Sequence, residues 1–228
     1  IYQLGIKTVK KYIKEHQVDC DFNECGKYFA SSKIEDEVIA KSFSNLLSKL
    51  GYKNKILDQK ELQSRLGTSF YKIGVYTDGG ILLNPGKLVR SMVDTLPSNI
   101  KLFENSQLLS WKKINDKIEC EFKNNTIKAD KIIFSTNGFL SSLNIQKNYN
   151  FPITLTASMT RPLSNDEFAN IGAPKEWGVL PIRPMGATIR FTKDKRILIR
   201  NTAEIRNPYS MNAQELSKRV KSHLKGIQ

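Results

Sequence analysis

The sequence predicts a mixed fold in which an α/β part is interleaved with an α+β part. Segments with helical spacing of apolar residues alternate with short strand-like segments along all 228 residues. An expected strand at 101–104 directly follows an expected helix at 85–96, which is half of a βαβ unit, and the later strands suit antiparallel pairs. No repeat or low-complexity linker divides the chain, so we expect a spatial domain division rather than a single cut in the sequence.

The first half of the chain carries the signals of four helices. Apolar residues at helical spacing predict an amphipathic helix over 1–15. The second helix follows an S-x-x-E capping box at 32–35, and a shorter third helix follows a D-x-x-E box at 58–61. The fourth begins at the Asn-Pro pair at 84–85, which places an N-cap residue before a proline in the first turn.

Strand-like segments fill most of the remaining chain. Tight turns at Asn115-Asp116 and Asn124-Asn125 separate a run of strands between 101 and 135. A helix that begins at a capping box at 164–167 interrupts the later strands, and a final helix opened by 212–215 follows them. The other expected strands are a hairpin at 18–31, a strand at 152–162, and the pair G-A-T-I-R-F-T (186–192) and R-I-L-I-R-N-T (196–202).

Composition and charge narrow the classes of partner. The formal net charge is +14, but the lysines are scattered along the whole chain and no segment matches a nucleic-acid-binding motif. We therefore expect no nucleic acid partner, while a negatively charged partner or substrate stays open. No apolar run approaches the ~20 residues of a membrane-spanning helix, so no membrane span is expected.

The cysteines and histidines point to a cytoplasmic protein without a metal site. Cys20, Cys25 and Cys120 form no CxxC pair and do not make a disulfide framework, so a reducing cytoplasm is the simpler interpretation. His16 and His223 offer little material for a zinc site or a Ser-His-Asp triad.

One candidate ligand contact lies in the segment K-A-D-K-I-I-F-S-T-N-G (128–138). A buried strand expected at 132–134 runs straight into Ser135, Thr136, Asn137 and Gly138. A parallel strand that ends in small residues lets the backbone approach a bulky ligand at the carboxyl end of a sheet. The alternative is an ordinary turn with Asn-Gly as turn residues, which spacing alone favours.

The glycines set a limit on nucleotide binding by this chain. A dinucleotide site usually shows G-x-G-x-x-G after a strand, and the thirteen glycines never take that spacing. The Asp78-Gly79-Gly80 segment is a turn rather than a phosphate loop. If a nucleotide binds, its phosphate loop must come from sequence that this chain lacks.

A second candidate site lies on the strand expected at 186–192. Thr188, Arg190 and Thr192 share one face of this strand, and Ile189 and Phe191 share the other. An arginine on the polar face could bind a carboxylate through two parallel hydrogen bonds. The alternative is a solvated strand arginine without a ligand, and the strand by itself does not decide between the two.

Four segments of the chain carry a family resemblance when they are taken together. In chain order they are G-V-Y-T-D-G-G-I-L-L-N-P-G-K-L-V-R-S-M (74–92), I-K-L-F-E-N-S-Q-L-L-S-W (100–111), A-D-K-I-I-F-S-T-N-G-F-L-S-S-L (129–143) and R-P-M-G-A-T-I-R-F-T-K-D-K-R-I-L-I-R-N-T (183–202). They resemble the D-amino acid oxidase superfamily of FAD-dependent oxidoreductases, which includes glycine oxidase, sarcosine oxidase and the γ-glutamylputrescine oxidoreductases. The fourth segment is most similar to the γ-glutamylputrescine oxidoreductase branch.

This resemblance implies a flavoprotein with FAD as its cofactor and a small amine or amino acid as its substrate. The backbone at Leu108 would lie near the adenine, and the 135–138 segment near the ribose and pyrophosphate. Thr188 and Arg190 match the hairpin strand that approaches the substrate. The reaction would oxidise a C–N bond, with hydride passing to the flavin. The resemblance identifies no catalytic residue in this chain.

The resemblance also implies two domains. Residues 1–17 and 68–143 would form part of an FAD/NAD(P)-binding-like domain, and residues 18–67 and 144–228 a substrate domain with a mixed or antiparallel sheet. The family's N-terminal G-x-G-x-x-G unit and its C-terminal flavin segment are absent from the 228 residues, so the chain resembles a fragment. A complementary chain, a split gene or a shortened chain would each account for the missing phosphate loop.

Three hypotheses follow from these observations. The first is an FAD-dependent oxidoreductase that acts on amines or amino acids. The second is a non-catalytic remnant or binding module that keeps the fold and has lost the cofactor. The third, a basic nucleic-acid-binding protein, has only the net charge in its favour.

Overall fold

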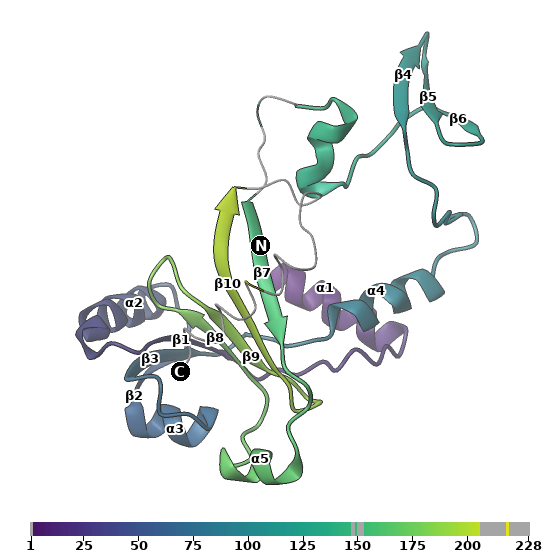
Figure 1. Ribbon diagram of the computed structural model, residues 1–228. Coiled ribbons are helices and arrows are strands. Elements are labelled where there is room, and N and C mark those ends of the chain that lie inside the picture. Colours follow the sequence, from purple (N-terminus) through teal and green to yellow (C-terminus); the bar gives the residue numbers. More distant parts are fainter. Residues whose placement is uncertain (1, 147–148, 150–152, 206–217, 219–228) are drawn as a thin grey trace. The chain divides into compact units, whose positions relative to one another are not determined.

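The computed structural model describes residues 2–146, 149, 153–205 and 218 (Figure 1). Within 153–205, side chains are described up to residue 200. The structure contains a seven-stranded mixed sheet and a three-stranded antiparallel sheet, which confirms the predicted fold class. No helix in the described ranges is both long and apolar enough to cross a membrane.

The chain divides into two compact units, each of which we describe by itself. Among the described residues, the first unit comprises 2–95, 155–202 and 218, and the second comprises 96–146, 149, 153–154 and 203–205. Residues 68–95 lie in the unit of the large sheet, whereas the predicted domain division joins 68–143. The assignment of domains to cofactor and substrate stays a prediction.

The large sheet is built around a central strand pair from distant parts of the chain. β1 pairs in parallel with β8, and the other strand pairs of described register are antiparallel. In spatial order the strands are β2 (Asn54–Asp58), β3 (Ile73–Thr77), β1 (Lys27–Ser31), β8 (Trp177–Pro181), β9 (Thr188–Phe191), β10 (Ile197–Ile205) and β7 (Ile153–Met159).

Helices α2 (Glu37–Lys49) and α3 (Gln59–Leu66) pack on opposite faces of β1–β3 (Figure 1). Ala40 of α2 packs in one apolar cluster with Val75 of β3. Leu62 of α3 belongs to a second cluster, which continues beneath β8 and β9. Burial of these apolar side chains is the main source of stability in this unit.

Most helices begin at the caps that the sequence predicts. Asp58 and Ser164 form complete capping boxes before α3 and α5 (Asn165–Asn170), and Asn84 caps α4 (Pro85–Asp94). Helix α1 (Tyr2–Glu15) matches the expected range.

The capping box expected at 32–35 is wrong. A 3-10 turn, η1 (Ile34–Asp36), precedes α2, and Asp36 takes the N-cap position without a side-chain cap bond. The reason is that the Asp36 carboxylate is already bound by Ser31 and Arg183.

The second unit contains a meander of three strands. β4 (Ser110–Ile114), β5 (Lys117–Glu121) and β6 (Thr126–Ala129) are joined at the two predicted Asn-containing turns. Trp111 on β4 also binds the segment that follows β6, because its Nε1 donates a hydrogen bond to the Leu143 carbonyl at 3.2 Å.

Three expected strand arrangements are wrong. The segments 101–104 and 132–134 pair with no strand among the described residues, and Ile133 is 92% exposed. A parallel strand keeps its backbone hydrogen bonds only where neighbours flank it, and the described ranges supply none for these segments. The hairpin at 18–31 is replaced by pairing of β1 with β3 and β8. The helix expected from 212–215 lies outside the described residues.

An ion pair between buried Asp36 and partly exposed Arg183 joins η1 to the segment after β8. The Asp36 side chain is fully buried. Its two carboxylate oxygens each accept a hydrogen bond from Arg183 Nε at 3.0 Å, and Oδ2 also accepts from Ser31 Oγ at 2.6 Å. These hydrogen bonds, that of Arg183 first, lower the pKa of Asp36 from 3.8 to about 2. The pair therefore stabilises the fold while Asp36 is ionised.

We expect Asp36→Asn to lower the midpoint of thermal unfolding by several degrees at neutral pH, because it leaves Arg183 without its charged acceptor. Since the pKa of Asp36 is lower in the folded state, the stabilisation is complete above its ordinary pKa of 3.8 and is lost as the pH falls toward about 2. Calorimetry across this pH range should show the difference between wild type and variant shrinking. Glu35→Gln, at the neighbouring exposed carboxylate, is the control; an equal effect of both changes would contradict the role of Asp36.

Candidate functional site

Strand β9 separates two cavities of different chemistry. As predicted, Thr188 and Arg190 lie on one face, where both line a cavity of about 200 Å³. Ile189 and Phe191 lie on the other face and line a cavity of about 560 Å³. The strand alternation therefore assigns the polar pair and the apolar pair to different sites.

The smaller cavity is built from four segments of the first unit. Its described lining contains two cationic side chains, those of Lys27 and Arg190, and no aspartate or glutamate. The residues that line it are Gly26, Lys27, Gly79, Gly80, Ile81, Leu82, Gly178, Val179, Leu180, Thr188 and Arg190.

The turn at 78–80 forms a wall of this cavity, a role that the sequence analysis missed. Gly80 O accepts a hydrogen bond from Gly26 N at 3.0 Å, and Leu82 N donates to Asn23 O at 2.8 Å. A Cβ on Gly80 would lie 2.5 Å from the carbonyl carbon of Gly26, so only glycine allows this approach of the two backbones. The Gly79-Gly80 pair in the sequence indicated a close approach of two backbone segments. The sequence did not show that the other segment is the one around Gly26.

Gly178 of β8 leaves space beside Arg190. The two residues lie directly opposite each other in the antiparallel pairing of β8 and β9. A Cβ built on Gly178 would meet Leu82 Cδ2 at 3.6 Å and Arg190 Cγ at 3.9 Å, which are ordinary van der Waals distances. The backbone thus tolerates a side chain here, and the glycine keeps the floor of the cavity open next to the arginine.

Arg190 is a cation without an acidic partner among the described residues. Its side chain is half-buried, and burial, followed by the positive charge of Arg200, lowers the pKa of its guanidinium. An arginine stays protonated at neutral pH despite such a shift. Thr188 beside it is 2% exposed, and its Oγ1 accepts a hydrogen bond from Arg200 Nη2 at 2.9 Å. This arrangement suits an anion bound against Arg190.

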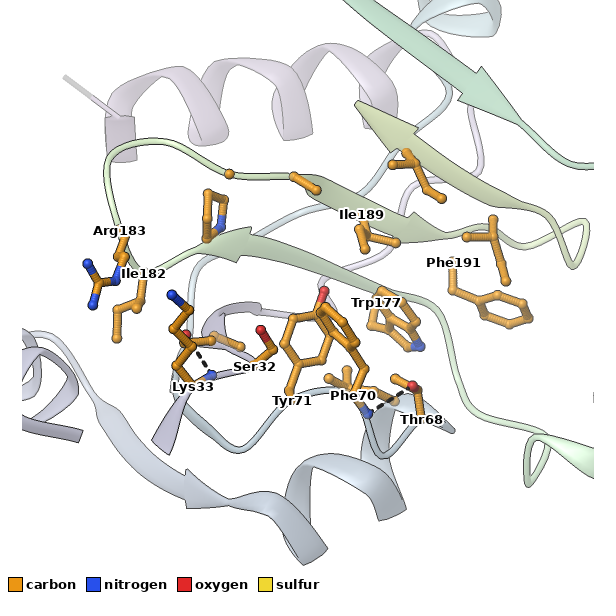
Figure 2. A pocket seen from close by; sticks show the side chains of 18 of the residues that line it. Ser32, Lys33, Thr68, Phe70, Tyr71, Trp177, Ile182, Arg183, Ile189 and Phe191 are labelled. Atoms are coloured by element: carbon orange, nitrogen blue, oxygen red, sulfur yellow. Dashed lines mark hydrogen bonds between the residues drawn. The ribbon is translucent and has the colours of Figure 1, made fainter. Parts of the chain in front are cut away.

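The larger cavity on the opposite face is mainly apolar. Figure 2 shows Tyr71, Trp177 and Phe191 around it, with Arg183 toward one end. Burial raises the pKa of the Tyr71 phenol, which keeps that group neutral. The Arg183 guanidinium is already paired with the Asp36 carboxylate through Nε and Nη2. The lining of this cavity contains Asp36 as well as the cations Lys33 and Arg183, whereas the described lining of the small cavity contains no acid. Despite its greater volume, the larger cavity is therefore less suited to recognise a carboxylate.

The predicted cofactor residues lie in the second unit. Leu108 is half-buried just before β4, and Ser135, Asn137 and Gly138 are exposed where the 3-10 helix η2 (Asn137–Leu143) begins. The hydroxyl of Thr136 is buried and has no hydrogen-bond partner among the described residues.

Contacts within this unit join the strand after Leu108 to the segment around Thr136. Trp111 of β4 packs on Phe134 with ring centroids 5.3 Å apart, in addition to its hydrogen bond with Leu143. The unsatisfied hydroxyl of Thr136 and the exposed small residues beside it fit a polar ligand with hydrogen-bonding oxygens, such as the ribose and pyrophosphate of FAD.

A family model described as FAD dependent oxidoreductase (DAO) matches residues 1–227. The chain belongs to the DAO family of FAD dependent oxidoreductases. A curated relative, Probable oxidoreductase OrdL from Rhizobium meliloti (strain 1021), is 26% identical to this DAO-family chain over 144 residues. That match covers 60% of the chain and 33% of the relative.

Solved structures share the fold at low sequence identity. Glycine oxidase from Geobacillus kaustophilus has a TM-score of 0.69 at 12% identity, with 93% of this chain and 57% of that protein covered. L-proline dehydrogenase from P. horikoshii has a TM-score of 0.70 at 17% identity (99% and 61% covered). Iminodiacetate oxidase (IdaA) from Chelativorans sp. BNC1 has a TM-score of 0.70 at 14% identity (98% and 62% covered). The DAO-family chain thus spans less than two thirds of each of these proteins.

We expect Gly178→Val in the full-length protein to keep the fold and to weaken carboxylate binding at least about tenfold, because the branched side chain fills the space beside Arg190. Calorimetric titration with a small carboxylate measures the affinity, and circular dichroism checks the fold. Gly178→Ala is the matched control, since its single methyl group makes only ordinary contacts. Unchanged affinity in a folded Gly178→Val protein would place the carboxylate elsewhere.

Proposed function

We propose that the full-length protein containing this chain is an FAD-dependent oxidoreductase that oxidises the C–N bond of an amino acid or a related carboxylate-bearing amine. The observation that carries this proposal is the half-buried Arg190, which lines a cavity without acidic residues in its described lining. Family membership supplies the reaction class, and this arginine supplies a reason to prefer substrates with a carboxylate.

Arg190 and Thr188 are the proposed substrate-binding residues. The planar guanidinium of Arg190 can hold a carboxylate through two parallel hydrogen bonds. Thr188 already accepts a hydrogen bond from Arg200, so its own O–H is free to donate to the same carboxylate. Held in this way, the substrate would present its amine-bearing carbon in a fixed orientation, and the walls of the small cavity would exclude water from it.

The proposed cofactor residues are Leu108 and the 135–138 segment. The backbone at Leu108 would contact the adenine, and Thr136 with its small neighbours would contact the ribose and pyrophosphate. When bound, FAD supplies the electron-accepting chemistry, taking hydride from the substrate carbon. Sequence outside these 228 residues, in the same or a complementary chain, would supply the phosphate loop.

Domain roles and location belong to the same proposal. We retain residues 1–17 and 68–143 for the cofactor domain and residues 18–67 and 144–228 for the substrate domain. We place the protein in the cytoplasm, because its three cysteines, Cys20, Cys25 and Cys120, are free.

We expect the full-length protein to purify yellow, with a flavin absorption spectrum, and to oxidise at least one amino acid or amine. Screening these compounds for peroxide formation or dye reduction measures the activity and separates an oxidase from a dehydrogenase. A colourless, folded full-length protein that added FAD does not stabilise would contradict the proposal, because a ligand of the native state must raise its stability. That result would favour a non-catalytic remnant of the fold.

We expect Arg190→Ala to raise KM for a carboxylate-bearing substrate about 10- to 150-fold, because it removes charged hydrogen bonds worth ~1.5–3 kcal/mol. Flavin content, read from the absorption spectrum, should not change. Arg65→Ala, at an exposed arginine of α3, removes the same charge away from the cavity and serves as the control. Turnover of the natural substrate that is unaffected by Arg190→Ala would show that Arg190 does not bind it.

A further inference from the structure

A second arginine shares the face of Arg190. The antiparallel pairing of β9 and β10 places Leu198 opposite Arg190, and Arg200 opposite Thr188. Residues directly opposite in such a pair point to the same face of the sheet, so Arg190 and Arg200 are diagonal neighbours on one face. Arg200 is half-buried, and its Nη2 donates to Thr188 Oγ1 at 2.9 Å.

Neither of these arginines has a carboxylate within ion-pair distance in the part of the chain that the structure describes. Three other arginines of the same unit do have acidic partners. The pairs are Arg161 with Glu167, Arg183 with Asp36, and Arg196 with Asp194. The contact of Arg200 with Thr188 is to a neutral hydroxyl and uses one of its five N–H donors. The two arginines therefore keep most of their donors for a ligand.

The charge of the site exceeds that of one carboxylate. Lys27 is the second positive group in the lining of the small cavity, beside Arg190, and the described lining includes no acid; Arg200 on the same face of the sheet is a third positive group. Like charges on neighbouring strands repel each other, and this repulsion is relieved when anions bind between them. One carboxylate on Arg190 would leave Arg200 without a counter-charge.

The guanidiniums of Arg190 and Arg200 lie on different sides of Thr188, so each can bind a different anionic group. Arg190 lies beside Gly178 on the β8 side of β9 and lines the small cavity. Arg200 approaches Thr188 from the β10 side and is not part of that lining. Two anionic groups on one small molecule could therefore contact one arginine each, with Thr188 between them.

We infer that the substrate is an amino acid with two carboxylates, one bound by Arg190 and Thr188 and the other by Arg200. This inference rests on the proposed function, because it specifies the substrate class of the same site. It distinguishes dicarboxylic amino acids from amines and from amino acids with a single carboxylate.

Kinetics of the full-length protein with and without Arg200→Met test this inference. The substrates are aspartate, glutamate and iminodiacetate, compared with glycine, alanine and proline. We expect the wild type to prefer a dicarboxylic compound. Arg200→Met should lower kcat/KM for that compound by about tenfold or more, and should change kcat/KM for monocarboxylic compounds by less than about twofold. Arg65→Met is the matched control, and Arg200→Lys, which keeps the charge, should restore part of the preference.

A binding measurement gives a readout that does not depend on turnover. Succinate should raise the unfolding temperature of the full-length protein more than acetate does, and Arg200→Met should remove this difference.

If the full-length protein prefers monocarboxylic amino acids and Arg200→Met affects all substrates equally, the inference is overturned and the proposed oxidation stands. If no amine or amino acid is oxidised, the proposed function fails, while the comparison of succinate with acetate still decides whether two carboxylates bind. Equal stabilisation of the wild type by succinate and acetate would also overturn the inference.

Discussion

The antiparallel pairing of β9 with β8 and β10 fixes which side chains reach the candidate site. Thr188 and Arg190 face the small cavity because Ile189 and Phe191 are held in the apolar cluster that contains Trp177. Side chains alternate with a period of two, so a shift of one residue would place the arginine in the apolar cluster. The cost of burying that charge makes the observed register the stable one.

The same pairing makes the site a feature of tertiary structure rather than of one motif. Gly178 of β8 leaves space beside Arg190, and β10 contributes Arg200. The glycine turn before α4 lies directly against Gly26 and forms a wall of the cavity. Each of these parts lies on a rigid strand or on a turn held by backbone hydrogen bonds. A substrate would therefore meet a preorganised set of donors, which reduces the entropy lost on binding.

Local features of the chain could be predicted, and features that depend on distant strands could not. The caps at Asp58, Asn84 and Ser164 were predictable because a cap requires only a few consecutive residues. The alternation of Thr188 and Arg190 was predictable for the same reason. Arg200 was missed because its position opposite Thr188 follows from a strand register that no single segment specifies.

Strand predictions failed where pairing partners decide the outcome. The segment at 132–134 has the apolar residues of a strand, yet Ile133 is exposed and no described strand pairs with the segment. The hairpin expected at 18–31 gave way to pairing of β1 with β8, a strand about 150 residues away in sequence. Helix signals are local, whereas a strand is defined by its neighbours.

The most direct test of the account is a crystal structure of the full-length protein with FAD and a bound carboxylate substrate analogue. We predict that the carboxylate lies against the Arg190 guanidinium and the Thr188 hydroxyl, on the face of β9 that carries both. A carboxylate bound in the apolar cavity beside Tyr71 and Trp177, with Arg190 uncontacted, would contradict it.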